Sequence, residues 1–207
     1  RRVLFRSTLA VGPMVPAEVN TLKDFVDWAK ANPAKAFYGT SGAGSMQHFG
    51  GVMINRALGI ELGHVPFRGA APAVQDLVAG QIATNFAVIL NVLPMIKAGQ
   101  VRALATTGAK RSSSLPDVPT FAELGYPDVV VEEWFGVFMP AGTPRAIVDK
   151  GNEAIRAALR TNEVTAAMQT MALENVSQAP EQFARLVSSD FAKWRSVVAT
   201  TGFTMDE

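Results

Sequence analysis

Tyr38-Gly39-Thr40-Ser41-Gly42-Ala43-Gly44-Ser45-Met46-Gln47-His48 is the stretch that decides the fold, because it joins a short strand to an amphipathic helix through a glycine- and hydroxyl-rich turn. Glycine lets the backbone turn tightly and approach a ligand closely. The helix that follows presents unpaired N–H groups and a partial positive charge at its N-terminus. The stretch therefore predicts a corner suited to a carboxylate or another small anion.

Strand-like and helix-like segments alternate on both sides of this turn. Thr21 and Asp24 predict the capping box of a helix that stops at Asn32-Pro33. After the turn, apolar residues repeat at helical spacing up to Gly59, the expected C′ residue. Further strands are predicted over residues 61–67, 81–88 and 101–107, with helices from Pro72 to Gly80 and around residues 92–97. This alternation predicts an α/β protein with a parallel-type sheet, whose ligands bind beyond the carboxyl ends of the strands.

The second half of the chain is predicted to be largely helical. A polar connection over residues 108–119 leads to a short helix capped by Thr120 and Glu123, and then to a long apolar strand over residues 129–139. Trp134 and Phe135 in that strand are expected to serve core or hinge packing. Three helices follow, beginning at Thr143-Pro144 and covering residues 164–173 and 180–200. Their apolar stripes predict core positions, including Phe183, Leu186, Phe191 and Trp194.

Length and composition exclude several classes of protein. The chain has 207 residues, 48% of them hydrophobic, which is enough for one sizeable domain or two small lobes. Its 19 basic and 18 acidic residues nearly cancel, so we expect no nucleic-acid partner. No cysteine is present, which excludes disulfides and thiol chemistry, and two histidines alone do not suit a structural zinc site. No apolar run reaches the roughly 18 residues that a membrane-spanning helix needs.

Three enzymatic motifs resemble the opening turn, and each fails at a particular residue. The turn lacks the Gly-Lys-Ser/Thr of a phosphate-binding P-loop, and Gln47 stands where a dinucleotide-binding fingerprint has its third glycine. Gly39-Thr40-Ser41-Gly42-Ala43 carries the serine of a nucleophile elbow but ends in alanine. A hydrolase that uses Ser41 or Ser45 with His48 remains the rival hypothesis. It requires a serine–histidine hydrogen bond and an acid that orients the histidine.

Structural roles explain the remaining candidate side chains more simply. His48 lies one helical turn after Ser45 and is expected to form a structural hydrogen bond or to orient the turn or a ligand. His64, in a strand before Val65-Pro66, is expected to pack or to form a hydrogen bond. Arg68 could pair with an anionic ligand or remain in solvent.

Several motifs, in order along the chain, resemble one protein family. They are Tyr38-Gly39-Thr40-Ser41-Gly42-Ala43-Gly44-Ser45 with His48, His64-Val65-Pro66-Phe67-Arg68-Gly69, Gly80-Gln81-Ile82, Ile96-Lys97-Ala98-Gly99-Gln100-Val101-Arg102-Ala103-Leu104-Ala105, Leu115-Pro116-Asp117-Val118-Pro119-Thr120, Trp134-Phe135-Gly136 and Pro140-Ala141-Gly142-Thr143-Pro144. From about Leu9 to its end, the chain is similar to the Bug, or TctC-like, receptors. These are the periplasmic substrate-binding proteins of tripartite tricarboxylate transporters.

The resemblance implies a monomeric, non-enzymatic periplasmic binding protein of the type II class, whose two lobes close over a small organic carboxylate without a cofactor. Its partners would be the ligand and membrane transporter subunits; a receptor of the same fold that serves a signalling system is the alternative. In the family, backbone N–H groups, hydroxyls and water hold one carboxylate between glycine-rich loops. The ligand-binding residues implied here are Thr40, Ser41, Ala43, Gly44, Ser45, His48, Gly69, Ala70, Phe86 and Ala87. The family often has Asp at the position of Ala87, so the usual contact to an amino group is in question.

The resemblance also implies domain boundaries. Residues 1–7 are similar to translated sequencing-adapter sequence and are excluded from the predicted fold as non-native. Residues 8–16 would be a connector strand from lobe 1, residues 17–126 lobe 2, and residues 127–207 a crossover strand and the helical C-terminal part of lobe 1. The N-terminal half of lobe 1, with its own ligand loop, is missing from this match. We therefore expect an apolar exposed face on the helices between residues 144 and 200.

Overall fold

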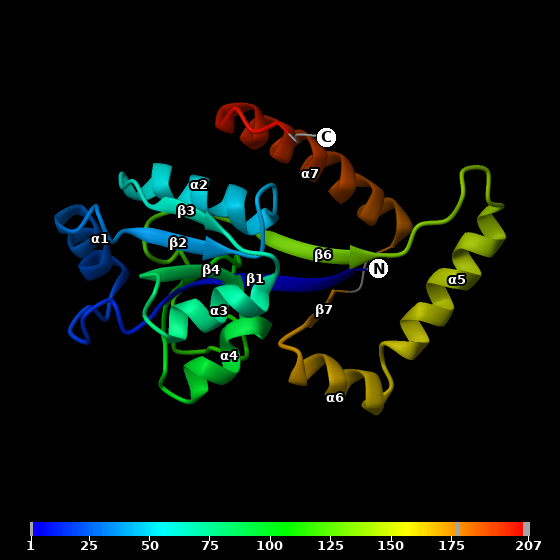
Figure 1. Cartoon of the computed structure of the whole chain (residues 1–207). Coiled ribbons are helices and arrows are strands. Elements are labelled where there is room, and N and C mark those ends of the chain that lie inside the picture. Colours follow the sequence, from blue (N-terminus) through cyan, green and yellow to red (C-terminus); the bar gives the residue numbers. More distant parts are fainter. Residues whose placement is uncertain (1, 177–178, 205–207) are drawn as a thin grey trace. The chain divides into compact units, whose positions relative to one another are not determined.

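The computed structural model describes residues 2–176 and 179–204. The chain divides into two compact units: unit 1 comprises Arg1–Phe5 and Glu133–Val197, and unit 2 comprises Arg6–Glu132 and Val198–Glu207. The helices and strands, labelled in Figure 1, are β1 (Arg2–Val11), α1 (Leu22–Ala31), β2 (Phe37–Thr40), α2 (Met46–Leu58), β3 (Gly63–Pro66), α3 (Ala70–Val78), β4 (Thr84–Val88), α4 (Ile89–Lys97), β5 (Arg102–Thr106), β6 (Glu132–Gly136), α5 (Arg145–Ala158), α6 (Asn162–Thr170), β7 (Glu174–Val176) and α7 (Pro180–Thr201).

The sheet of unit 2 contains strands in the order β3-β2-β4-β1-β5. β2 runs parallel to both β3 and β4, as the alternation of strands and helices predicts. β1, however, runs antiparallel to both β4 and β5. The prediction of a parallel-type sheet is therefore wrong for β1, and the sheet is mixed. A local hydrophobic pattern identifies a strand but not its neighbours, because those come from distant parts of the chain.

The described residues 2–7, which were left out of the predicted fold, form the first part of β1. Ser7 pairs with Val88 of β4, and its backbone N–H donates to Thr107 Oγ1 at 3.2 Å. Leu4 is buried. These residues therefore belong to the folded chain, whatever their origin.

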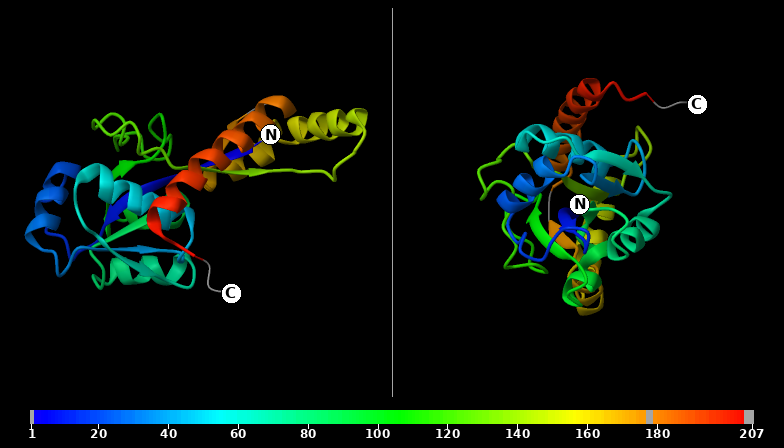
Figure 2. Two further views of the ribbon diagram at one scale, coloured as in Figure 1. Left: turned by 90° about the horizontal axis from the view of Figure 1, so that it is seen from above. Right: turned by 60° about the vertical axis from the view of Figure 1, so that its left-hand side comes forward.

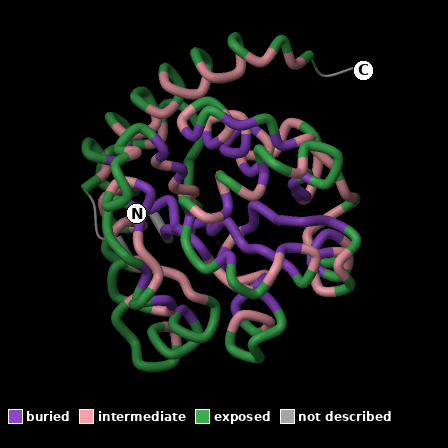
Figure 3. Tube along the Cα trace, turned by 90° about the vertical axis from the view of Figure 1, so that its left-hand side faces the viewer, coloured by how far each residue is buried: buried purple, intermediate pink, exposed green. Residues whose placement is uncertain are grey.

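Helices cover both faces of the parallel strands of unit 2 (Figure 1). On one face, Gly50 of α2 packs so closely on Phe86 of β4 that a Cβ atom there would collide with the ring. On the other face, Val74 of α3, Ala87 of β4 and Val92 of α4 form one core cluster. Figure 3 shows the resulting layers, with buried strands between helices whose outer sides are exposed.

Several local predictions hold in detail. The capping box of Thr21 and Asp24 is present at the start of α1. Gly59 ends α2 in the left-handed conformation, with φ 59°. Thr120 and Glu123 also form reciprocal capping bonds of 2.7 and 3.1 Å, but the residues that follow form turns rather than the predicted helix. A capping box marks where a helix can begin, while its length depends on packing.

Unit 1 contains β7, the helices α5 and α6, β6 from Glu133 onward and α7 up to Val197. The bounds of α5, α6 and α7 differ from the predicted ones by a few residues at most. β7 was not predicted; it pairs antiparallel with residues 2–4 of β1. β6 covers residues 132–136 only, whereas the prediction extended to residue 139. The segment after β6 continues in the direction of the strand, and α5 then runs back beside it (Figure 2). The end of the Met139 side chain lies beside Gly151. Among the described helices, none combines the length and the apolar character needed to cross a bilayer.

The expected apolar exposed face on the C-terminal helices is confirmed. α5 buries none of its residues, and Ile147 on it is 54% exposed. The core assignments are partly wrong: Phe183 is buried, but Phe191 and Phe135 are each 69% exposed. Trp134 packs as predicted, since its ring meets Phe183 edge-on at 4.9 Å and its Nε1–H donates to Asp190 at 2.7 Å. Periodicity identifies an apolar stripe, but it does not reveal which part of the stripe is covered.

Candidate functional site

The two glycine-containing turns of the predicted site lie side by side at the carboxyl ends of the parallel strands of unit 2. The first turn follows β2 and the second follows β3. The backbone N–H of Gly69 in the second turn donates to the carbonyl oxygen of Ser41 in the first, at 3.0 Å. This bond brings the N-termini of α2 and α3 to the same edge of the sheet.

Internal hydrogen bonds hold the first turn in shape. The Ser45 hydroxyl donates to the Gly42 carbonyl at 2.7 Å and accepts from the His48 backbone N–H at 3.2 Å, so Ser45 is the N-cap of α2. The buried Thr40 hydroxyl also donates to the Gly42 carbonyl, at 3.1 Å. Gly44 adopts φ 74°, and a Cβ atom on it would lie only 2.8 Å from Phe203. The turn therefore needs glycine here for both its conformation and its packing.

A stacked pair of histidines contacts the first turn through hydrogen bonds to Gly44 and Thr40. The His48 and His64 rings are parallel within 13°, and their centroids are 4.1 Å apart. The Gly44 N–H donates to His48 Nδ1 at 3.2 Å, so the neutral His48 ring carries its hydrogen on Nε2. His64 Nε2 lies 2.7 Å from Thr40 Oγ1. The tautomer of His64 decides which of these two atoms donates.

Both rings are held in the uncharged form. Burial lowers the pKa of His48 below its ordinary value. Burial, and secondarily the neighbouring His48, lowers the pKa of His64 to about 4. The hydrogen bonds of His48 with Gly44 and of His64 with Thr40 confirm the structural roles expected for both histidines.

A small cavity of about 30 Å³ lies at the junction of the two turns. It contains four of the predicted ligand-binding residues and no charged side chain. Its lining consists of Ser41, Gln47, Ala70, Ala73, Asn85, Phe86, Ala87, Val88 and Asn91. The structure thus brings the predicted residues Ser41, Ala70, Phe86 and Ala87 together around one cavity.

Backbone donors of two helices border this cavity. Gln47 is the second residue of α2 and Ala70 is the first residue of α3, so both helix N-termini reach it. The N-cap of α3, Gly69, provides no side-chain cap. The backbone N–H of Gly69 already donates to the Ser41 carbonyl, and Pro72 has no N–H. The N–H groups of Ala70 and Ala71 are therefore the donors of the first turn that α3 itself does not use. An anion at this point would meet the positive ends of two helix dipoles.

Asn85 is a site residue that sequence reasoning missed. It is 1% exposed, lines the cavity, and its Nδ2 has no hydrogen-bond partner within the described residues. In the sequence, Asn85 follows Thr84 in an otherwise apolar strand and precedes the predicted Phe86-Ala87. A buried asparagine in a central strand was the only available signal, and it does not indicate the direction of the side chain.

The other predicted residues do not line the cavity. Thr40, Gly44, Ser45 and His48 build the turn, Gly69 joins the two turns, and Ala43 is exposed at the tip. Arg68 is exposed and also lies outside the lining.

The hydrolase hypothesis lacks its required contacts. In the described part of the chain, neither Ser41 nor Ser45 offers its hydroxyl to an imidazole; Ser45 instead bonds to backbone groups. The hydroxyl that does reach an imidazole belongs to Thr40, which is fully buried. Over the same residues, no group of three metal-ligating side chains is present.

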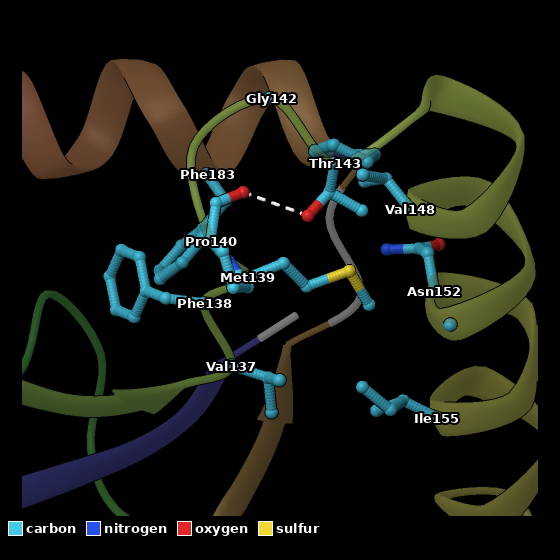
Figure 4. A pocket seen from close by; sticks show the side chains of 12 residues that line it. Val137, Phe138, Met139, Pro140, Gly142, Thr143, Val148, Asn152, Ile155 and Phe183 are labelled. Carbon is cyan, nitrogen blue, oxygen red and sulfur yellow. Dashed lines mark hydrogen bonds between the residues drawn. The ribbon is translucent and has the colours of Figure 1, made fainter.

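A larger cavity of about 280 Å³ lies in unit 1, and it contains none of the predicted site residues (Figure 4). The segment from Val137 to Thr143 forms one wall, and α5 forms the other through Val148, Asn152 and Ile155. The lining is mostly apolar. The one hydrogen bond drawn there runs from the Thr143 hydroxyl to the Pro140 carbonyl, 2.8 Å, and closes the turn.

A neutral, donor-rich cavity at the carboxyl ends of parallel strands is typical of α/β proteins that bind small molecules. Residues 4–203 match the family described as the tripartite tricarboxylate transporter family receptor, TctC, and the chain belongs to this family.

Three similar proteins illustrate the relationship. The UPF0065 protein of the tcbD-tcbE intergenic region of Pseudomonas sp. strain P51 is 35% identical over 95% of this chain, which spans 59% of that relative. The structure of R. palustris Rpa4515 with adipate has a TM-score of 0.83 at 32% identity, covering 97% of this chain and 66% of that one. MatC from Rhodopseudomonas palustris with bound malate has a TM-score of 0.77 at 30% identity, covering 95% of this chain and 67% of that one. The chain thus spans about three fifths of the length of the first curated relative.

Proposed function

We propose that this chain belongs to a periplasmic receptor that binds a small organic carboxylate and delivers it to the subunits of a membrane transporter, without catalysing a reaction. The observation that carries the proposal is the cavity where the N-termini of α2 and α3 meet beside Ser41. Family membership supports the receptor role, and the adipate and malate in two similar structures support the ligand class.

The proposed site binds an anion through neutral donors. Backbone N–H groups at the helix N-termini and the hydroxyl of Ser41 would surround the carboxylate, while the hydrogen-bonded turn keeps these donors in place before the ligand arrives. Donors fixed in advance cost little ordering entropy on binding. Ligand binding would then favour the closed form of the complete receptor, which membrane partners recognise.

Calorimetric titration with malate and adipate tests this function. We expect both acids to bind, and their neutral diamides to bind much more weakly, because only the acids place charge at the helix N-termini. Ala70→Glu should abolish acid binding by like-charge repulsion. Gln75→Glu, which adds the same charge at an exposed position on α3, should not. If the wild-type chain binds neither acid, or binds acids and diamides equally, the proposal is wrong.

A further inference from the structure

Asn85 is placed so that its amide has room but no partner. In the register of the sheet it lies opposite Gly39 of β2 on one side and Ala10 of β1 on the other. Cross-strand partners share a face of the sheet, so two very small residues flank the Asn85 side chain. Ala73 of α3 lines the same space. None of these three residues, Gly39, Ala10 and Ala73, can offer a side-chain acceptor to Asn85 Nδ2.

A buried amide without a partner lowers the stability of the free protein, because its hydrogen bonds to water are lost without replacement. Asn85 is 1% exposed, and its Nδ2 has no partner among residues 2–176 and 179–204. The side chain also lines the cavity that receives the N-termini of α2 and α3. The free donor and the helix N-termini thus face the same space, and all of them require an acceptor.

The cavity restricts what that acceptor can be. Its 30 Å³ exceeds the roughly 10–15 Å³ that a cavity needs in order to hold one water molecule, so a single oxygen atom of a carboxylate has room there. No acidic side chain lines it, and Ala87 beside Asn85 is apolar, so an ammonium group would find no counter-charge. The chemistry favours an anionic oxygen.

We propose that Asn85 is a ligand-binding residue whose Nδ2–H donates to a carboxylate oxygen of the bound acid, fixing how that carboxylate sits between α2 and α3. This inference rests on the proposed function. It assigns the Asn85 side chain to the recognition of a carboxylate at the place where Ala87 leaves no group to recognise an amine.

Two neighbouring variants of β4 separate ligand binding from stability. Asn85→Leu keeps the size of the side chain and removes the free donor. Thr84→Val removes a buried hydroxyl that donates to the Ala10 carbonyl at 2.7 Å and does not line the cavity. We expect Asn85→Leu to weaken malate and adipate binding roughly ten- to a hundredfold without lowering Tm. Thr84→Val should lower Tm and leave both affinities unchanged.

The outcomes are distinct. If wild-type protein binds the acids and Asn85→Leu binds them equally well, Asn85 is not a ligand residue while the proposed function stands. A fall in Tm for Asn85→Leu as large as that for Thr84→Val would also overturn the inference, since it shows a structural role. If Asn85→Leu does not fold, Asn85→Asp decides: it keeps the shape but faces the ligand with a negative charge, and unchanged affinity would contradict the proposal. Wild-type protein that binds neither acid overturns the function and this inference together.

Discussion

The imidazoles of His48 and His64 support the turn after β2 only while both are uncharged. Protonation would remove the acceptor that His48 Nδ1 offers to the Gly44 N–H. Two charged rings whose centroids lie 4.1 Å apart would also repel each other. No carboxylate is among the groups that act on either histidine, so the fold favours their neutral forms.

The free energy of unfolding should therefore fall on acidification below about pH 6.5, the ordinary histidine value. The pKa of His64 is about 4 in the folded chain, and that of His48 is also lowered. Between those limits the unfolded chain binds protons that the folded chain does not, so stability rises with pH in this window and is level above it. Urea unfolding at a series of pH values measures the slope. The imidazole NMR signals of the two histidines should both titrate below 6.5, and that of His48 should report hydrogen on Nε2.

His64→Gln is the matched variant for this prediction. Glutamine can still donate a hydrogen bond to Thr40 but does not titrate, so the variant should lose much of the slope between pH 6.5 and 5. The exposed carboxylates with lowered pKa values, such as Asp24 and Glu123, titrate at lower pH and remain unchanged in the variant. An identical slope in both proteins would contradict a role for the histidine pair in the pH dependence.

The site could be predicted from sequence as far as local patterns extend. Glycines, hydroxyls and a helix start identified the turn, and Ser41 and Ala70 do line the cavity. Asn85 could not be identified in this way, because its role depends on Gly39 and Ala10 lying beside it in the sheet. The pairing of β1 with β4 creates that neighbourhood, and this pairing was not predicted.

At the scale of elements, α2 and α5 show how the same residue type has different consequences in two helices. Gly51 of α2 packs against Tyr38, and an added Cβ would overlap the buried tyrosine ring. Gly151 of α5 has only the flexible end of Met139 nearby. Close packing of α2 on the sheet therefore requires glycine, while α5 merely tolerates it.

Gly51→Ala should destabilise the chain by about 1–3 kcal/mol, the usual cost of overpacking a core. Gly151→Ala should instead raise helix stability by up to about 1 kcal/mol, since alanine restricts the unfolded chain and Met139 can move aside. Chemical denaturation of the two variants and the wild type measures both values. Equal destabilisation by both substitutions would show that α5 is packed as tightly as α2.

Other elements show where local patterns stop being informative. Phe183 and Phe191 occupy the same apolar stripe of α7, yet only Phe183 is covered, by Trp134 and Phe138. Helix starts and ends were predictable because caps such as Thr21 and Gly59 act over a few residues. Coverage was not, because it depends on which distant segment packs there.

At the scale of the whole molecule, the two units differ in how deeply their helices are buried. α2, with 13 residues, buries six of them, whereas α5, with 14 residues, buries none. Local opening of a helix that contributes no buried side chains exposes little additional apolar surface, so it costs little free energy. β4, with a paired strand on each side, represents the opposite case.

Native-state hydrogen exchange should therefore show much faster exchange in α5 than in α2, with β4 the slowest of the three. The comparison of α5 with α2 controls for helix length, since the two differ by one residue. Equal protection would mean that something covers the apolar residues of α5, such as Ile147, in solution. Dilution tests whether a second copy of the chain covers α5. If it does, the copies dissociate as the protein concentration falls, so exchange in α5 accelerates while exchange in α2 stays constant. Protection that does not change on dilution would contradict the view that α5 opens locally.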